Sequence, residues 1–258
     1  MAKVVVEQEG AVTLVSIDRF AEARNAVDPE TAVLLREAFL AFDRDASQSV
    51  AILTGRGGTF CAGFDLKVAA ARAGASLHDP EGPGPMGPTR HLLTKPVIAA
   101  VEGYAVAGGL ELALWCDLRV ASETAKFGVF CRRWGVPLID GGTVRLPRLI
   151  GQSRALDMIL TGREVGAREA HDWGLANRLA PAGQALGEAK ALAHLLVKFP
   201  QTCMRSDRQS SYEQWGLDLR GALTNEGRLG GPALDAESKK GAARFAAGKG
   251  RGGDFGNI

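Results

Sequence analysis

Apolar residues in the N-terminal part of the chain follow first a strand pattern and then a helix pattern. Two runs rich in β-branched residues, at 4–9 and 12–17, are separated by a Glu-Gly turn and predict a β-hairpin. Asp28 followed by Pro29 is typical of a helix start, because Asp caps a free backbone N–H and Pro suits the first turn. Apolar positions then recur at helical spacing and predict an amphipathic helix over 29–46.

Three short apolar runs further on lack the alternation of a half-exposed strand. They lie at 49–54, 97–101 and 118–121, and their continuous apolar character predicts strands buried on both faces of a parallel sheet. Helical patterns between them indicate β–α–β crossovers. Beyond residue 151 the pattern is mainly helical, and the predicted helices cover 152–160, 167–172, 183–198 and 237–245.

A Gly- and Pro-rich stretch over 72–90 shows little periodicity, and two interpretations stay open for it. It is either a surface loop without a further role or a mobile wall over a pocket, since long loops in compact domains often carry function.

Composition and charge describe a globular chain and exclude several classes of protein. Apolar residues make up 46% and charged residues 23% of the 258 residues, which excludes disorder as the main state. Lys and Arg number 31 against 29 Asp and Glu, and this near balance gives no large field that would collect nucleic acid or an acidic membrane. We find no secretory signal pattern and no apolar run of about 18 residues.

The cysteines offer no metal site. The four of them, at 61, 116, 131 and 203, form no CxxC pair and no cluster with histidine. We therefore expect a reduced, cytoplasmic protein without structural disulfides and without a bound metal.

Two Gly-rich junctions each follow a predicted strand and precede a helix. The first covers 57–66 and the second covers 103–113. Small residues let the backbone approach a ligand closely, and a helix N-terminus presents unpaired N–H groups with a partial positive charge. One N–H group from each junction could therefore converge on a developing oxyanion, an arrangement in which one donor is worth about 10²–10³ in rate.

The two junctions, FCAGFDL at 60–66 and GYAVAGGLELALWCDLRVAS at 103–122, resemble the crotonase (enoyl-CoA hydratase/isomerase) superfamily, and the resemblance continues through residues 127–177. It implies an α/β fold with a crotonase-like ββα spiral core over 1–200 that holds an acyl-CoA site. It also implies a helical C-terminal region over 201–258 that closes over CoA and contributes to a homotrimer or a dimer of trimers.

The resemblance implies that Phe64 and Gly108 supply the two N–H donors to a thioester oxygen. Glu111 lies about one helical turn after Gly108, so its carboxylate can face the same ligand, and it matches one of the two catalytic carboxylates of the hydratases. Its neighbours are apolar, and burial would raise its pKa into a range that suits proton transfer near neutral pH.

The chain departs from the hydratase pattern at the second catalytic carboxylate. Equal spacing places Cys131 where the hydratases carry Glu, and a thiol is a poor substitute because little of it is ionised at pH 7. Asp140 follows nine residues later beside a Gly-rich turn, where diketone hydrolases and a dehalogenase of the superfamily carry a catalytic Asp. Asp140 could equally be a structural turn residue, and both interpretations stay open.

Further contacts with the substrate are implied by position in the motifs. Arg24 matches a basic position near the CoA phosphates or pantetheine, the residues after the first donor would line the adenine side, and the tail would close over CoA. The substrate-contacting residues are expected to be Arg24, Ala62, Gly63, Asp65, Leu66, Lys67, Cys131, Phe245 and Lys249.

The favoured function is that of an enoyl-CoA hydratase-like lyase that adds water across the 2,3-double bond, with CoA carried by the substrate and no separate cofactor. An enoyl-CoA isomerase that uses Glu111 alone and a diketone C–C hydrolase that uses Asp140 are the alternatives. An RNA-binding protein is the alternative of another class, based on the basic tail over 239–251, although the balanced charge and few aromatic residues argue against it.

Overall fold

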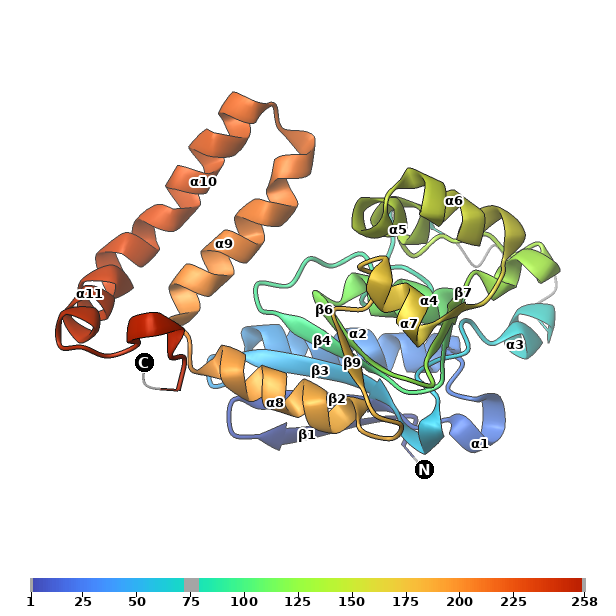
Figure 1. Ribbon diagram of the computed structural model, residues 1–258. Helices are drawn as coiled ribbons and strands as arrows, with labels where there is room; N and C mark the ends of the chain where they lie inside the picture. The colour runs from blue at the N-terminus through green and yellow to red at the C-terminus, as the bar shows by residue number, and fades with distance from the viewer. Residues whose placement is uncertain (1, 72–78, 257–258) are drawn as a thin grey trace. The chain divides into compact units, whose positions relative to one another are not determined.

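A six-stranded sheet organises the first part of the chain. In the computed structural model, which describes residues 2–71 and 79–256, the strands follow the order β1-β2-β3-β4-β6-β9 (Figure 1). The predicted hairpin is confirmed as an antiparallel pair, and every later strand is parallel to its neighbour. The strands are β1 (Val4–Glu9), β2 (Val12–Ile17), β3 (Val50–Gly55), β4 (Val97–Val101), β6 (Leu118–Ser122) and β9 (Arg178–Ala180).

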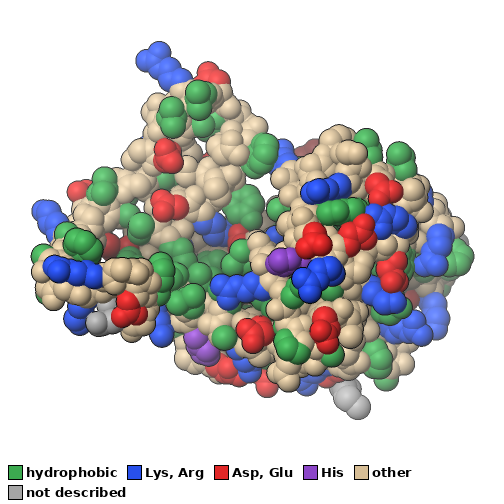
Figure 2. Space-filling view, in the orientation of Figure 1, with side chains coloured by type: hydrophobic (Ala, Val, Ile, Leu, Met, Phe, Trp, Pro, Cys, Tyr) green, Lys and Arg blue, Asp and Glu red, His purple; other side chains and the backbone are tan. Residues whose placement is uncertain are grey.

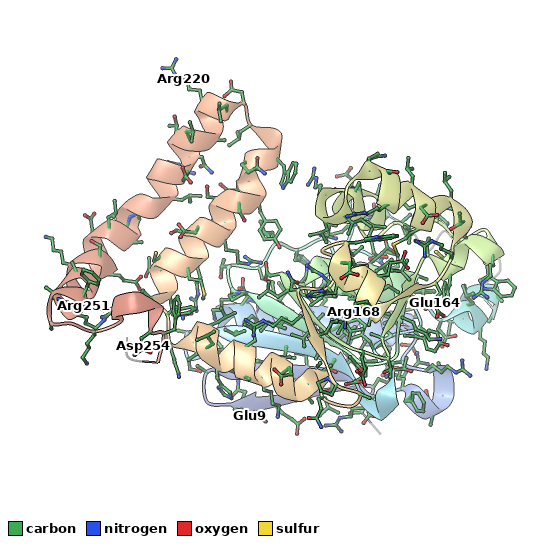
Figure 3. The ribbon with its side chains drawn as sticks, in the orientation of Figure 1. Glu9, Glu164, Arg168, Arg220, Arg251 and Asp254 are labelled. Carbon is green, nitrogen blue, oxygen red and sulfur yellow. The ribbon has the colours of Figure 1, made fainter. Side chains whose placement is uncertain are left out.

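Helices cover this sheet, as the continuous apolar runs predict. Helix α2 (Pro29–Arg44) begins at Asp28, whose side chain accepts the Thr31 N–H at 2.8 Å, and this confirms the predicted cap. Its buried face, which includes Leu35 and Phe39, packs into the core beside the central strands. Helix α8 (Ala185–Val197) is joined to the first hairpin by a hydrogen bond from Lys190 to Glu9, at the end of β1 (Figure 3).

A second, small sheet is not predicted by the sequence. It joins β5 (Tyr104–Val106), β7 (Lys126–Gly128) and β8 (Val165–Gly166), which have three, three and two residues. Strands this short carry no readable alternation of polar and apolar positions. The sheet matters because β5 leads directly into α4 (Gly108–Trp115), a helix in which all eight residues are buried.

A buried arginine side chain caps the C-terminal end of α4. Arg119 is fully buried and donates to the carbonyl oxygens of Ala113, at 3.3 Å, and Cys116, at 2.8 Å. These carbonyls belong to the end of the helix, where unpaired oxygens carry partial negative charge. Arg119 thus fixes the end of α4 that lies opposite Gly108.

The chain divides into two compact units, Met1–Ala193 and His194–Ile258, so the division falls within α8, whereas the sequence places it after residue 200. Besides the elements above, the first unit contains α1 (Phe20–Ala23), α3 (Leu66–Ala71), α5 (Gly142–Ile150), α6 (Gln152–Thr161) and α7 (Ala167–Asp172). The second contains α9 (Gln201–Glu213), α10 (Leu219–Ala233) and α11 (Lys239–Ala246).

The predicted helices near 152–160, 167–172, 183–198 and 237–245 are confirmed as α6, α7, α8 and α11. The helical C-terminal region over 201–258 that the resemblance implies is confirmed by α9, α10 and α11, although the apolar pattern does not give the bounds of α9 and α10, which pack against each other. Within residues 2–71 and 79–256 there is no helix long and apolar enough to cross a membrane. Figure 2 shows basic and acidic side chains interspersed over the face in view.

Candidate active site

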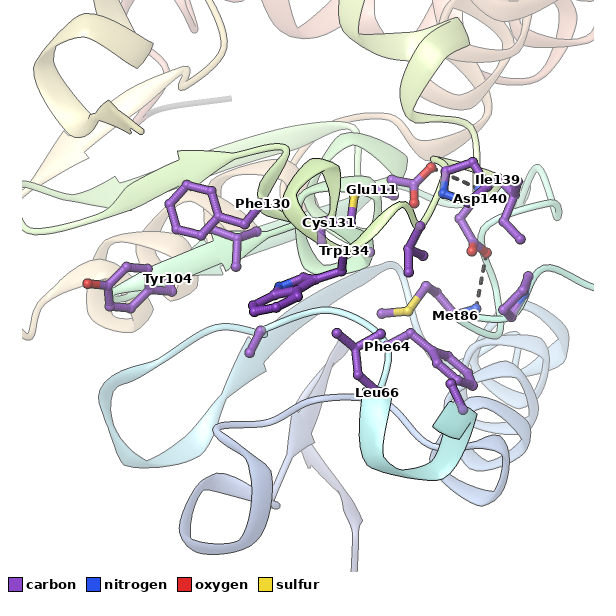
Figure 4. Close-up of a pocket in the computed structure, with 18 of the residues that line it drawn as sticks. Phe64, Leu66, Met86, Tyr104, Glu111, Phe130, Cys131, Trp134, Ile139 and Asp140 are labelled. Atoms are coloured by element: carbon purple, nitrogen blue, oxygen red, sulfur yellow. Dashed lines mark hydrogen bonds between the residues drawn. The ribbon is translucent and has the colours of Figure 1, made fainter. Parts of the chain in front are cut away.

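A cavity of about 540 Å³ opens in the first unit where the two Gly-rich junctions meet. Its wall also includes residues of the Gly/Pro-rich stretch, a 3₁₀ turn over Phe130–Trp134, and the segment that precedes α5. Figure 4 shows side chains around it, and those that carry the argument below are Met86, Glu111, Cys131 and Asp140. The backbone N–H groups of Phe64 and Gly108, which also line the cavity, complete the set.

The two junctions are brought together by neighbouring parallel strands. Strands β3 and β4 are parallel neighbours, so the segments that leave their carboxyl ends run side by side. They join through a β-bridge between Cys61 and Ala105, in which Cys61 donates to the Tyr104 carbonyl and accepts the Val106 N–H. Gly63 has φ +100°, and a Cβ built on it would lie 3.2 Å from the backbone nitrogen of Gly108. The absence of a side chain at Gly63 therefore lets the first junction approach the start of α4.

The backbone N–H groups of Phe64 and Gly108, two residues that line the cavity at this meeting point, have no acceptor within the described part of the chain. Gly108 is the first residue of α4 and has no intrahelical partner by geometry. The amides on either side of Phe64 are satisfied, since Gly63 donates to Cys61 Sγ and Asp65 donates to the Val27 carbonyl. Both free N–H groups belong to residues that line the cavity, so they are available to a ligand oxygen.

The backbone just before Gly108 is strained. Ala107 has φ +53° and ψ −125°, a conformation that residues with a Cβ rarely adopt. Its N–H donates to the Gly128 carbonyl of β7 at 2.9 Å, which helps to hold the strained turn in place. Strained backbone conformations of this kind persist only where the surrounding structure holds them, and they cluster at active sites and ligand-binding sites.

Glu111 projects into the cavity from the first turn of α4. Its side chain is buried, with the residue 2% exposed, and Oε1 accepts the N–H groups of Asp140 and Gly142, both at 2.8 Å. Its other oxygen, Oε2, has no hydrogen-bond partner among the residues that the structure describes. Burial, reinforced by the nearby Asp140 carboxylate, raises the pKa of Glu111 to about 7, so the group exchanges protons near neutral pH.

Asp140 is buried beside Glu111 and anchors the Gly/Pro-rich stretch. Its Oδ1 accepts the Met86 N–H at 3.1 Å and the hydroxyl of Thr89. Burial raises the pKa of Asp140, against the opposing effect of these two hydrogen bonds. Asp140 therefore holds a wall of the cavity with its carboxyl group and orients Glu111 with its backbone.

Part of the stretch over 72–90 contributes to this wall. Residues 72–78 lie outside the described residues, but Pro85 and Met86 line the cavity. Met86 is buried, and its sulfur would lie 2.5 Å from a Cβ placed on Gly108, so the thioether packs directly against the start of α4. The interpretation of the stretch as a pocket wall is supported by these two residues.

Cys131 lies in the 3₁₀ turn and lines the cavity, with its sulfur toward Glu111 (Figure 4). Burial and then the Glu111 carboxylate raise the pKa of its thiol, so the thiol is neutral at pH 7. Phe130 and Trp134 flank it in the same turn, and the Arg133 guanidinium lies over both rings, 4.9 and 5.8 Å from their centroids.

Sequence reasoning does not identify Met86, Tyr104, Phe130, Arg133 and Trp134 as pocket residues, although all of them line the cavity. The spacing of Phe130 and Trp134 around Cys131 was the available signal, because one helical turn places residues three and four apart near each other.

The remaining predicted contact residues fall into three groups. Arg24, Ala62 and Leu66 line the cavity, and Gly63 lies behind it. Asp65 and Lys67 are not part of its lining, because Asp65 is buried in an ion pair with Arg19 at 3.1 Å and Lys67 is exposed on α3. Phe245 and Lys249 belong to the second unit, on α11 and just after it, and their contact with CoA stays a prediction.

Comparison with known proteins agrees with the motifs and the fold. The family model described as enoyl-CoA hydratase/isomerase matches residues 7–250. The chain belongs to the enoyl-CoA hydratase/isomerase family. The predicted resemblance is thereby confirmed, and with it the expectation of an enzyme with the crotonase fold.

The relatives of this chain include proteins named as hydratases and proteins named as dehydratases. It is 43% identical over 197 residues to the enoyl-CoA hydratase EchA19 of Mycobacterium tuberculosis, covering 73% of this chain and 72% of the relative. It is 35% identical over 250 residues to a carnitinyl-CoA dehydratase of Salmonella arizonae, covering 90% and 94%. The crystal structure of the enoyl-CoA hydratase EchA1 of Mycobacterium marinum superposes with a TM-score of 0.88 at 38% identity, covering 95% and 96%.

Proposed function

We propose that this family enzyme is an enoyl-CoA hydratase-like lyase that adds water across the 2,3-double bond of an enoyl-CoA. The observation that carries the proposal is the pair of unpaired N–H groups, of Phe64 and Gly108, in the same cavity as the Glu111 carboxylate. The names of the hydratase and dehydratase relatives support a hydro-lyase.

The two N–H groups activate the thioester. The carbonyl oxygen of the enoyl-CoA accepts both, and it gains negative charge when a nucleophile adds to C3 and an enolate forms. Donors fixed in the folded backbone stabilise this charge without reorganising, and removing one such donor typically costs about 10²–10³ in rate. The Gly108 N–H also lies at the positive end of α4.

Glu111 moves the proton. Its free Oε2 takes a proton from water as the water oxygen bonds to C3, and the π electrons move to the thioester oxygen. The same carboxyl group, now protonated, then delivers this proton to C2 as the enolate collapses. The sum is the addition of H and OH across C2 and C3. A pKa of about 7 suits both steps, because the group is neither a strong acid nor a strong base at neutral pH.

Asp140 acts as a positioning residue in this scheme. Its N–H holds Glu111 Oε1, and its carboxyl group fixes Met86 in the cavity wall. Its side chain already accepts two hydrogen bonds on Oδ1, which favours an anchoring role over repeated proton transfer.

An enoyl-CoA isomerase is the second candidate, and one observation favours it. Glu111 has a free carboxylate oxygen, whereas the side chain at the neighbouring position is the Cys131 thiol. A single carboxylate is sufficient to carry a proton between C2 and C4 of a β,γ-enoyl thioester, with the same two N–H groups holding the dienolate oxygen.

Mass spectrometry in D₂O separates the two reactions. The enzyme is incubated with crotonyl-CoA and, separately, with a β,γ-enoyl-CoA, and Glu111→Gln and Asp140→Asn are treated in parallel. Gain of the mass of water from crotonyl-CoA, lost in Glu111→Gln and retained in Asp140→Asn, is the expected result. Deuterium uptake or double-bond migration without water gain would replace the hydratase by the isomerase. No change in either thioester would refute both.

A further inference from the structure

We propose that Cys131 is a covalent attachment site for α,β-unsaturated acyl thioesters, through addition of its thiol to C3. This inference rests on the proposed function, because it requires that the cavity binds an enoyl thioester beside Glu111. It goes beyond that function by assigning a second nucleophile to the same carbon atom.

The placement of Cys131 differs from that of the other three cysteines. Its side chain lines the cavity beside Glu111, whose charge acts on the thiol. Cys61 and Cys116 are buried without lining the cavity, and Cys203 is exposed on α9 in the second unit. Only Cys131, among these four, combines access to the cavity with a buried base next to it.

The site contains every group that thiol addition requires. C3 of an enoyl thioester is electrophilic because the C2=C3 bond is conjugated with the carbonyl group, and sulfur is a better nucleophile toward such a carbon than water. The Glu111 side chain is buried, aimed into the cavity, and retains an oxygen without a partner in the described chain. The N–H groups of Phe64 and Gly108 are placed to hold the enolate oxygen that addition produces.

The step balances without any further reactant. Glu111 takes the proton from the Cys131 thiol, the S–C3 bond forms, and the π electrons of C2=C3 move to the thioester oxygen. The protonated Glu111 then gives the proton to C2, so the S–H bond is replaced by a C2–H bond. The product is a saturated thioester joined to Cys131 through a thioether at C3. The reverse sequence releases the enoyl thioester.

The resting thiol is protected from other electrophiles. Burial and the Glu111 carboxylate keep it protonated, and a protonated thiol is a weak nucleophile. The reaction therefore depends on an acyl group that brings its own carbonyl oxygen to the two N–H donors. We expect Cys131 to react with an enoyl-CoA faster than the exposed Cys203, and Cys203 to react faster than Cys131 with a small maleimide.

Acryloyl-CoA is the probe, because its unsubstituted C3 accepts a thiol most readily. The full-length enzyme is incubated with it, quenched in acid so that the thioether cannot reverse, and measured by intact-mass spectrometry and peptide mapping. The expected result is one added acryloyl-CoA on Cys131, at a rate that saturates with concentration and falls in the presence of butyryl-CoA. Cys131→Ala should abolish this adduct, the matched Cys203→Ala should retain it, and Glu111→Gln should slow it at least tenfold.

Hydration of crotonyl-CoA, measured in the same preparation, keeps the two proposals distinguishable. Hydration without an adduct on Cys131 would overturn the covalent site and leave the proposed function in place. An adduct confined to Cys203, or undiminished in Cys131→Ala, would also overturn it. If neither thioester reacts and butyryl-CoA does not bind, the covalent site and the proposed function both fail.

Discussion

The backbone N–H of Asp140 donates to Oε1 of Glu111 at 2.8 Å, so the residue that carries the second carboxyl group of the cavity also orients the first. The two residues also interact through charge. Burial is the larger cause of the raised pKa of Glu111, and the Asp140 carboxylate is the second. A substitution of the Asp140 side chain removes the charge and leaves the backbone hydrogen bond. This separation makes the coupling accessible to experiment.

We expect kcat/KM for hydration to rise with pH and to level off above an apparent pKa of about 7, since Glu111 must be ionised to accept a proton from water. Asp140→Asn removes a negative charge that disfavours ionisation, so its profile should be shifted to lower pH. The measurement is the pH dependence of kcat/KM for both proteins. An unshifted profile in Asp140→Asn would contradict the coupling.

Glu111→Gln should stabilise the fold while it inactivates the enzyme. Because the folded-state pKa of about 7 lies above the ordinary 4.5, the folded chain binds the proton more tightly than the unfolded chain between these values. The free energy of unfolding of the wild type therefore falls as pH rises through this window, and Gln removes the dependence. We expect a gain of about 1–3 kcal/mol at pH 8 that vanishes near pH 4 in urea titrations. An equal gain at both pH values would point to packing instead of charge.

Adjacent glycines at the start of α4 should respond differently to alanine. A Cβ on Gly109 would lie 2.1 Å from the backbone oxygen of Cys61, which cannot move without separating the two junctions. A Cβ on Gly108 would meet the Met86 side chain, which can rotate away. Gly109→Ala should unfold at markedly lower denaturant, whereas Gly108→Ala should fold and show a raised KM. Similar stability of the two variants would argue against this packing.

Arg119→Leu should destabilise the first unit by about 3 kcal/mol or more, because it leaves the carbonyl groups at the end of α4 buried and unpaired. Arg119→Lys keeps the charge but loses the forked geometry and should recover only part of the loss. The check is the free energy of unfolding from urea titration. Full recovery by Lys would show that charge alone matters at this position.

Trp134→Ala should affect substrate binding and leave stability nearly unchanged. Trp134 is 64% exposed although it lines the cavity, so it contributes little to the core. We expect KM for enoyl-CoA to rise several-fold, and more for bulky apolar acyl groups than for crotonyl-CoA, with a change in unfolding free energy below about 0.5 kcal/mol. An equal effect on all acyl chains would place Trp134 at the CoA portion instead.

The elements that the sequence predicts are those whose signals are local. The Asp28 cap, the two β-branched runs and the apolar segment at 97–101 each carry their pattern within a few residues, and all are confirmed. The second sheet was missed because β8 has two residues and β7 has three. The bounds of helices α9 and α10 could not be predicted from the apolar pattern, because these helices have almost no buried residues to set a period, and only the resemblance implies that 201–258 is helical.

The residues of the candidate site also divide into those that the sequence predicts and those that it does not. The positions of Phe64, Gly108 and Glu111 in the cavity could be predicted because they lie inside two motifs. Met86 could not, because a wall residue is defined by what folds against it, and no pattern within 79–90 indicates a partner. For Trp134 the signal was its spacing from Phe130 and Cys131, which places the three residues together but does not indicate a cavity. Asp65 shows that a motif position alone is not sufficient, since its place inside FCAGFDL does not reveal that Arg19 holds it in a buried ion pair outside the cavity lining.

The cavity wall contributed by Pro85 and Met86 has a consequence for how this enzyme can diversify. The oxygen of the thioester would be held by segments fixed to adjacent strands, where an inserted residue would shift the strand register. The wall beside it belongs to a connection between those strands, where insertions are tolerated. Under the proposed function, a change of acyl preference can therefore arise by lengthening or shortening one loop, while the two proposed N–H donors are inherited unchanged.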